Sequence, residues 1–131
     1  MKMIQLGIVV VLAHLVVSLA HGYAHTQLGV GLTTWQNLYV MIVITLAPLM
    51  AAFLLWMGRG RVAYIVLAVS MAGALIFGGY YHYVGISPDH VSHLPPGDTQ
   101  GLFRLTAVLL LVTEFLGFIV GVIGLRSTRA T

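Results

Sequence analysis

The chain has 131 residues, of which 60% are hydrophobic and only 7% are charged, and it carries a formal net charge of +3. A soluble domain has roughly 25% charged residues, so this composition excludes an ordinary soluble fold. The few positive charges flank apolar segments and form no basic tract, so nucleic acid is not an expected partner. There is no cysteine, which excludes disulfides, thiolate metal sites and thiol redox chemistry.

Four apolar runs follow one another along the chain, at about residues 4–25, 35–57, 62–83 and 102–125. Each supplies the ~20 residues needed to cross a hydrocarbon core about 30 Å thick. Too little sequence remains outside these runs for a separate soluble domain. The sequence therefore predicts an all-α integral membrane protein, a four-transmembrane-helix bundle forming a single membrane domain over residues 1–131.

Basic residues set the expected orientation of this bundle. Five of the six flank spans on the same side: Lys2, Arg59, Arg61, Arg126 and Arg129. By the positive-inside rule, both termini are cytoplasmic and the protein is a multi-pass protein of a cytoplasmic (inner) membrane. The loop over residues 84–100 is then on the outer face. Arg104, at the outer end of the fourth span, is the exception.

The first span carries an unusual polar stripe. His14, Ser18, His21 and His25 recur at spacings of four, three and four residues. At 100° per residue their side chains share one narrow face of a helix. Polar side chains within a span usually face the protein interior and mark a functional site.

The second span contains Pro48 near its middle, and we expect a kink there because proline removes a backbone hydrogen bond. The third span ends in a run of small and aromatic residues that includes Gly78, Gly79 and His82. This position places His82 near the outer interface, at about the depth of His21 and His25.

The loop over residues 84–100 is the longest polar stretch. Ser87 followed by Pro88 is typical of a helix start, with serine as N-cap and proline at the first helical position. We therefore expect a one-turn interfacial helix that presents Asp89, His90 and His93.

The fourth span holds Glu114, which shares a helix face with Gly117 and Gly121. Such a GxxxG pattern favours close helix packing, so Glu114 is expected to point at a neighbouring helix. Counted from the span ends, Glu114 and His14 lie at a similar depth and form a candidate intramembrane polar pair. This pair has two interpretations: a proton relay or cation waypoint, or a hydrogen bond that fixes helix packing.

Five of the six histidines map to the outer face, together with one aspartate. Imidazole nitrogens bind copper, zinc and iron, and the i, i+4 pair His21/His25 resembles the helical pair of a zinc site. The leading hypothesis is a membrane protein that binds a transition metal at this face, in metal handling or redox. The candidate ligands are His21, His25, His82, Asp89, His90 and His93.

Two alternatives stay open at this point. His21 and His82 could ligate a haem b between helices, with room left by Gly78 and Gly79, in a haem- or quinone-linked electron-transfer subunit. The chain could also be an accessory structural subunit without chemistry of its own, associated with the lipid bilayer and with other membrane subunits or further copies of itself. The sequence has no phosphate-binding loop, dinucleotide turn or nucleophile motif, so a stand-alone enzyme is not expected, whereas a subunit of a membrane oxidoreductase is consistent with it.

Overall fold

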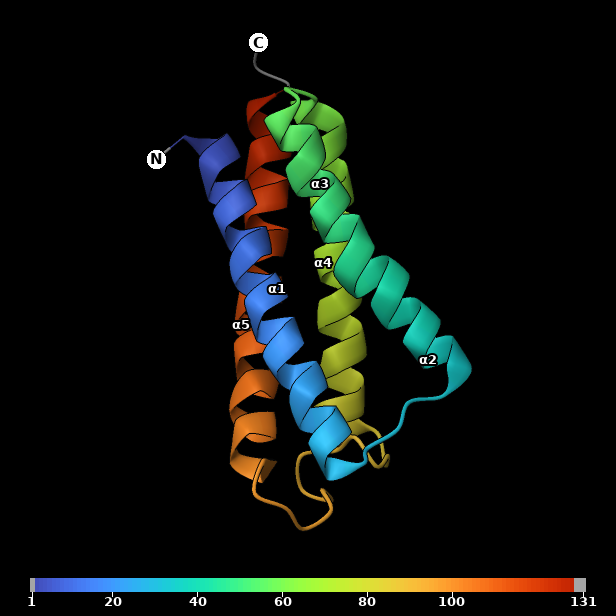
Figure 1. The fold of residues 1–131 in the computed structure, drawn as a ribbon. Coiled ribbons are helices and arrows are strands. Elements are labelled where there is room, and N and C mark those ends of the chain that lie inside the picture. Colours follow the sequence, from blue (N-terminus) through green and yellow to red (C-terminus); the bar gives the residue numbers. More distant parts are fainter. Residues whose placement is uncertain (1, 129–131) are drawn as a thin grey trace.

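The computed structural model describes residues 2–128, and within this range the chain is helical and has no strand. Four helical segments are long and apolar enough to cross a membrane: Met3–Leu28, Thr34–Trp56, Gly60–Val84 and Gln100–Ser127. The first is α1 (Met3–Leu28) and the last is α5 (Gln100–Ser127). The prediction of an all-α bundle of four candidate transmembrane helices is confirmed (Figure 1).

The second and third segments each contain a wider, π-helical stretch. The second runs through α2 (Thr34–Tyr39), η1 (Val40–Leu46) and α3 (Ala47–Trp56). The third runs through α4 (Gly60–Gly79) and η2 (Tyr80–Val84). Wide turns of this kind are rare and often occur at functional sites.

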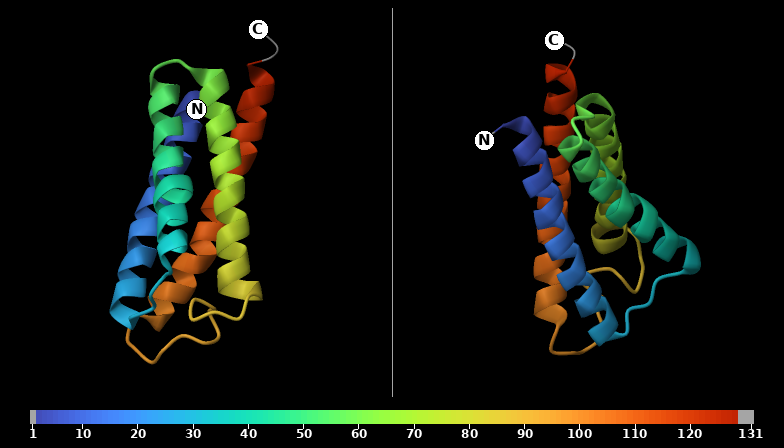
Figure 2. Two further views of the ribbon diagram at one scale, coloured as in Figure 1. Left: turned by 90° about the vertical axis from the view of Figure 1, so that its right-hand side faces the viewer. Right: turned by 45° about the horizontal axis from the view of Figure 1, so that its top comes forward.

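Pro48 explains the irregularity of the second segment. It occupies the first turn of α3, directly after η1, and has no N–H to donate to the turn before it. The N–H of Ala47 bonds the carbonyl of Ile42, five residues back, as the wider spacing of a π-helix requires. The expected change of helix geometry at Pro48 therefore takes the form of seven π-helical residues, and beyond them α2 leans away from α1 (Figures 1 and 2).

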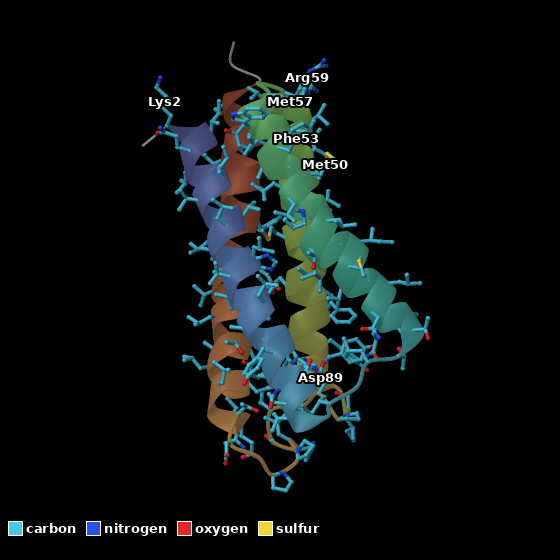
Figure 3. All side chains as sticks on the ribbon, viewed as in Figure 1. Lys2, Met50, Phe53, Met57, Arg59 and Asp89 are labelled. Carbon is cyan, nitrogen blue, oxygen red and sulfur yellow. The ribbon has the colours of Figure 1, made fainter. Side chains whose placement is uncertain are left out.

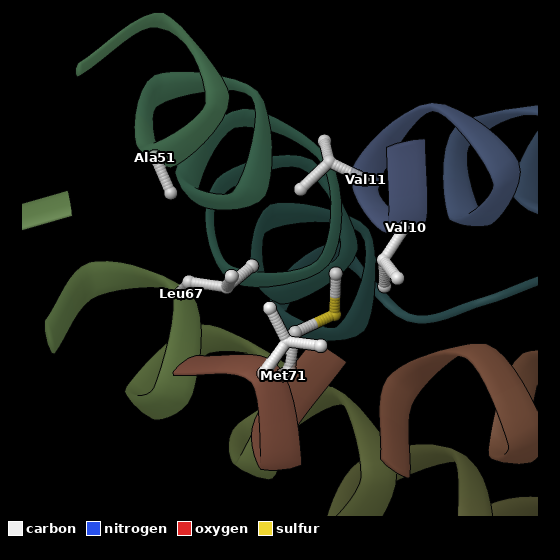
Figure 4. Packing of buried hydrophobic residues seen from close by; sticks show 6 residues of the cluster. Val10, Val11, Ala51, Leu67 and Met71 are labelled. Atoms are coloured by element: carbon white, nitrogen blue, oxygen red, sulfur yellow. The ribbon is translucent and has the colours of Figure 1, made fainter. Parts of the chain in front are cut away.

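The segment of α2, η1 and α3 lies alongside the other helices in the half of the bundle that contains the two chain ends and leans away from them in the opposite half (Figure 2). A core cluster joins α1, α3, α4 and α5 there, and Figure 4 shows its buried side chains: Val10, Val11, Ala51, Leu67, Met71 and Val120. Glycines bring α5 close to α4. A Cβ at Gly121 would lie 2.7 Å from the backbone nitrogen of Ala68, and one at Gly117 would lie 2.7 Å from Cγ of Met71.

Charge is separated between the two ends of the bundle. Lys2 and Arg59 lie at the end that contains both termini, whereas Asp89 lies towards the opposite end (Figure 3). The sides of the bundle expose large apolar residues, such as Val16 and Ile76, as expected for a lipid-facing surface. Arg129, part of the predicted cytoplasmic charge, lies outside the described residues.

The segment between η2 and α5 differs from expectation. Residues 85–99 form turns and bends, and the one-turn helix predicted after Ser87 is absent from this described segment. The hydroxyl of Ser87 instead donates to the carbonyl of Tyr81 at 3.0 Å. Ser87 therefore supplies a donor to a carbonyl of η2, and the residues after it form turns in place of the expected helix.

Candidate metal centre

Three histidines from two helices meet at the end of the bundle opposite the chain termini. His21 and His25 are one turn apart on α1, and His82 is on η2. One ring nitrogen from each lies within 4.8 Å of the other two, so the group can hold a metal ion. His21 and His82 are buried, with 6% and 5% of their surfaces exposed. The prediction that imidazoles from separate segments gather here is confirmed.

Hydrogen bonds fix one nitrogen of each ring. His25 Nδ1 donates to the carbonyl of Val30 at 3.0 Å, and His82 Nδ1 donates to the carbonyl of Asp89 at 3.0 Å. In the third case, His21 Nδ1 lies 2.8 Å from Oγ1 of Thr106. Because a carbonyl accepts only, the Nδ1 atoms of His25 and His82 carry protons, and the Nε2 atoms are the ones left to contact other partners.

The same assignment holds for His21. The hydroxyl of Thr106 donates to the carbonyl of Leu102 at 2.7 Å, so it accepts the proton on Nδ1 of His21. The Nε2 of His21 is then unprotonated, and it is buried without a hydrogen-bond partner among residues 2–128. A buried nitrogen lone pair without a partner is costly and is a sign that something binds there.

Asp89 lies against the histidine group and is 4% exposed. Its Oδ1 is 3.0 Å from Nε2 of His25, and its Oδ2 is 3.6 Å from Nδ1 of His82. Burial alone would raise the pKa of this carboxyl, but the hydrogen bond from His25 and the charges of His82 and His25 outweigh burial and hold the pKa below its usual value. A metal ion bound to Nε2 of His25 would take the place of the proton in this hydrogen bond.

The other two loop histidines are placed apart from this group. His90 and His93 lie next to each other, with ring centroids 4.9 Å apart, and His93 is exposed. The backbone N–H of Ser92 donates to Nδ1 of His90 at 3.2 Å. Within residues 2–128, the group of potential ligands comprises His21, His25 and His82 and does not include this pair. The turn that replaces the expected short helix carries Asp89 inward and these two rings outward.

The predicted intramembrane polar pair is in contact. Nε2 of His14 lies 3.5 Å from Oε1 of Glu114, and both side chains are 2% exposed. The hydroxyl of Ser18 is also 3.5 Å from Nε2 of His14. The second carboxyl oxygen of Glu114, Oε2, is buried and has no hydrogen-bond partner in the described chain. The stripe on α1 therefore faces the interior along its whole length.

A cavity of about 570 Å³ connects the two polar groups. The histidine cluster and Asp89 line one end, and Ser18 and Glu114 line another part. The remaining wall is largely apolar and includes Val30, Leu32, Val40, Ile44, Phe77 and Leu110. The divergence of α2 and η1 from α1 leaves this space, since Val40 and Ile44 come from η1.

Thr106 and Phe103 belong to the site but were not predicted from the sequence. The Phe103 ring packs against His21, with ring centroids 4.5 Å apart. The helix face of Glu114 indicates both residues, because steps of four, four and three residues back along α5 lead through Leu110 to Thr106 and Phe103. Following that face outward from Glu114 places Thr106 at the depth of the histidines.

Comparison with protein-family models, with curated proteins and with solved structures finds no match to this chain. The chemistry of the site therefore rests on its geometry. Three imidazoles with ring nitrogens close together, a neighbouring carboxylate and an adjoining cavity form a centre that could hold a metal ion. Oriented Nδ1 protons are a usual property of metal-binding histidines.

Proposed function

We propose that this protein binds a transition-metal ion through Nε2 of His21, His25 and His82, within a membrane, and acts in metal handling or redox. The observation that supports the proposal best is the buried Nε2 of His21, which has no partner in residues 2–128 while Nδ1 of the same ring is hydrogen-bonded. An ion bonded to this nitrogen would remove the free-energy cost of burying its lone pair without a partner. Asp89 would balance part of the ion's charge or complete its coordination.

The dimensions of the group suit a bare ion. Two nitrogens bonded to one ion at about 2.0–2.1 Å are at most about 4 Å apart. The ring nitrogens here lie within 4.8 Å of one another, so small side-chain rotations close the site. Three protein ligands with an open side are typical of centres that also bind water or a substrate. Imidazole and carboxylate donors favour Cu(II), zinc or iron.

Haem ligation by His21 and His82 is less well supported. Imidazoles on opposite faces of a haem iron, each bonded at about 2 Å, have ring centres more than about 6 Å apart. The rings of His21 and His82 are 4.8 Å apart and meet edge to face, which leaves no space for a porphyrin between them. The packing therefore favours a bare ion over the haem alternative.

The ligand set is tested by metal analysis of purified protein. Wild type, the double variant His21→Ala/His25→Ala and the control His90→Ala/His93→Ala are compared by elemental analysis after passage over a weak chelator. We expect about one metal per chain in wild type and in the control, and loss of metal in the first double variant. The control removes the same number of imidazoles from the same face of the membrane.

Two results would contradict the proposal. A wild-type protein that retains no metal from medium containing copper, zinc and iron would instead favour the accessory-subunit alternative. Equal metal content in both double variants would show that bound metal is not held by the buried group. An absorption spectrum of the same wild-type sample tests the haem alternative, because haem gives an intense Soret band.

A further inference from the structure

Two buried polar atoms line the same cavity, and each lacks a hydrogen-bond partner within residues 2–128. One is Nε2 of His21, from α1, and the other is Oε2 of Glu114, from α5. The first is an acceptor, because its ring proton is on Nδ1. The second accepts a hydrogen bond when the carboxyl is ionised, and His14 approaches only the other carboxyl oxygen. A ligand that brings a hydrogen-bond donor would satisfy such acceptors.

Gly78 lies between the carboxyl group and the histidine cluster along the cavity lining. A methyl group placed on Gly78 would lie 3.7 Å from Oε2 of Glu114 and 3.8 Å from Cδ2 of His82. Because glycine has no side chain, residue 78 does not fill the cavity beside these two groups.

The rest of the cavity selects an apolar molecule. Its volume, about 570 Å³, is within the range of ordinary ligand pockets. An apolar wall that includes Val40, Ile44, Phe77 and Leu110 makes up much of its lining. A sugar or a hydrated ion would leave its polar groups unpaired against this wall. An apolar body with one hydroxyl matches both parts.

We propose that the cavity binds a lipid-soluble phenol from the bilayer, with its hydroxyl placed between Glu114 and the three-histidine centre. The phenolic hydrogen is donated to Oε2 of Glu114. The oxygen faces the histidines and, resting on the proposed function, occupies the open side of their metal ion. The apolar tail lies against η1. The aromatic ring of the ligand lies near Phe77, where ring–ring contact adds to burial.

The test compares a phenol with its methyl ether. Binding of 4-octylphenol and 4-octylanisole to protein in lipid nanodiscs is measured by equilibrium dialysis, with empty nanodiscs subtracted. We expect the phenol to bind at least roughly tenfold more tightly, because the ether has no proton for Glu114. The variant Glu114→Leu should reduce this preference to about twofold or less by weakening phenol binding alone.

A second pair of variants tests the location. Val40→Phe places a ring in the cavity from the wall remote from the histidines and should weaken both probes about tenfold or more. Ile42→Phe is the matched control, since Ile42 lies on the same η1 segment but is 56% exposed and does not line the cavity. It should leave both affinities unchanged. These variants also keep the test decisive if Glu114→Leu fails to fold.

Equal binding of phenol and ether would overturn the proposal, as would equal effects of Val40→Phe and Ile42→Phe. Metal content is measured in each sample, which separates this inference from the metal proposal. A metal-free wild type that still prefers the phenol in a Val40-dependent manner would refute the metal centre and retain the phenol site. A metal-loaded wild type that binds the phenol and the ether equally would refute the phenol site and retain the metal centre.

Discussion

His21, His25 and His82 each bond the protein through Nδ1, and Nε2 of His25 also lies 3.0 Å from Oδ1 of Asp89. The three Nδ1 partners differ: a threonine hydroxyl for His21, the carbonyl of Val30 for His25 and the carbonyl of Asp89 for His82. Two partners belong to the backbone, so no substitution removes them cleanly. Thr106 is the partner that can be deleted without changing the shape of the side chain.

Thr106→Val should weaken metal binding by about 10–100-fold, the usual cost of losing an orienting partner of a metal-binding histidine. Without the hydroxyl, the proton of His21 is no longer held on Nδ1, and the ring loses its fixed tautomer and orientation. Affinity is measured by competition with a chromophoric chelator. Thr113→Val is the matched control, because Thr113 makes the same bond to its own helix, to the carbonyl of Leu109 at 2.9 Å. An equal loss in both variants would mean that the effect comes from α5 and not from His21.

His14 and Glu114 allow the packing role of a buried polar pair to be measured. In a double-mutant cycle with His14→Leu and Glu114→Leu, we expect the double variant to be more stable than the sum of the single changes predicts. The coupling free energy should be near the membrane average of about 0.6 kcal/mol, since the contact is long at 3.5 Å. Reversible unfolding in mixed micelles gives these values. A coupling above about 2 kcal/mol would exceed what hydrogen bonds between membrane helices usually supply and would indicate a charged pair.

The ligand types could be predicted from the sequence, but their hydrogen-bond partners could not. His21, His25 and His82 could be placed together because span boundaries fix depth and helix periodicity fixes the face. The hydrogen bond from His21 to Thr106 joins residues 85 positions apart, so it depends on how α1 packs against α5. The exclusion of His90 and His93 depends on turn geometry, which a serine–proline pair suggested incorrectly.

At the scale of helices, the four spans could be predicted because each is a long apolar run that ends at a glycine, a charged residue or a polar loop. The two π-helical segments could not be predicted. Proline predicts an irregularity, but it does not say that seven residues from Val40 to Leu46 widen, nor that α2 leans outward as a result. The cavity depends on that lean, so the sequence indicated the polar end of the site and gave no indication of the apolar wall.

The α4–α5 contact depends on glycine at one position more than at another. At Gly121 an added Cβ would lie 2.7 Å from the backbone nitrogen of Ala68, and backbone cannot move without shifting α4. At Gly117 the obstacle is the side chain of Met71, which is flexible. We expect Gly121→Ala to lower the free energy of unfolding by about 1–3 kcal/mol, and Gly117→Ala to lower it by less. Thermal unfolding in detergent compares them. The reverse order would contradict the close backbone approach.

For the molecule as a whole, the polar site occupies one end of the bundle, and the core cluster that joins all four helical segments lies nearer the other. The core around Leu67 and Met71 holds α1, α3, α4 and α5 together near the chain ends. The histidine end is held mainly by α1, η2, α5 and the loop that contains Asp89. Because this core cluster holds the helices together near the chain ends, α2 and η1 can diverge at the histidine end and leave a cavity while the bundle stays folded.

The orientation of the bundle would decide which compartment supplies an ion to the proposed metal centre. Lys2, Arg59, Arg61 and Arg126 lie at the ends of spans on the same side, and the positive-inside rule predicts that this side is cytoplasmic. Since the chain has no cysteine, single cysteines report sidedness cleanly. Ser92→Cys and Ser127→Cys are suitable, because both positions are exposed, serine and cysteine are similar in size, and the two sites lie at opposite ends of the bundle.

In spheroplasts, a membrane-impermeant maleimide should label the cysteine at position 92 and leave the cysteine at position 127 unlabelled until the membrane is permeabilised. The reason is energetic: reversing the bundle would move the cationic end across the bilayer against the membrane potential, at about 2.3 kcal/mol per charge per 100 mV. Labelling of position 127 alone would indicate the reverse orientation, with the proposed metal centre at the cytoplasmic face. Labelling of both positions in intact spheroplasts would mean a mixed topology, which the concentration of basic residues at one end argues against.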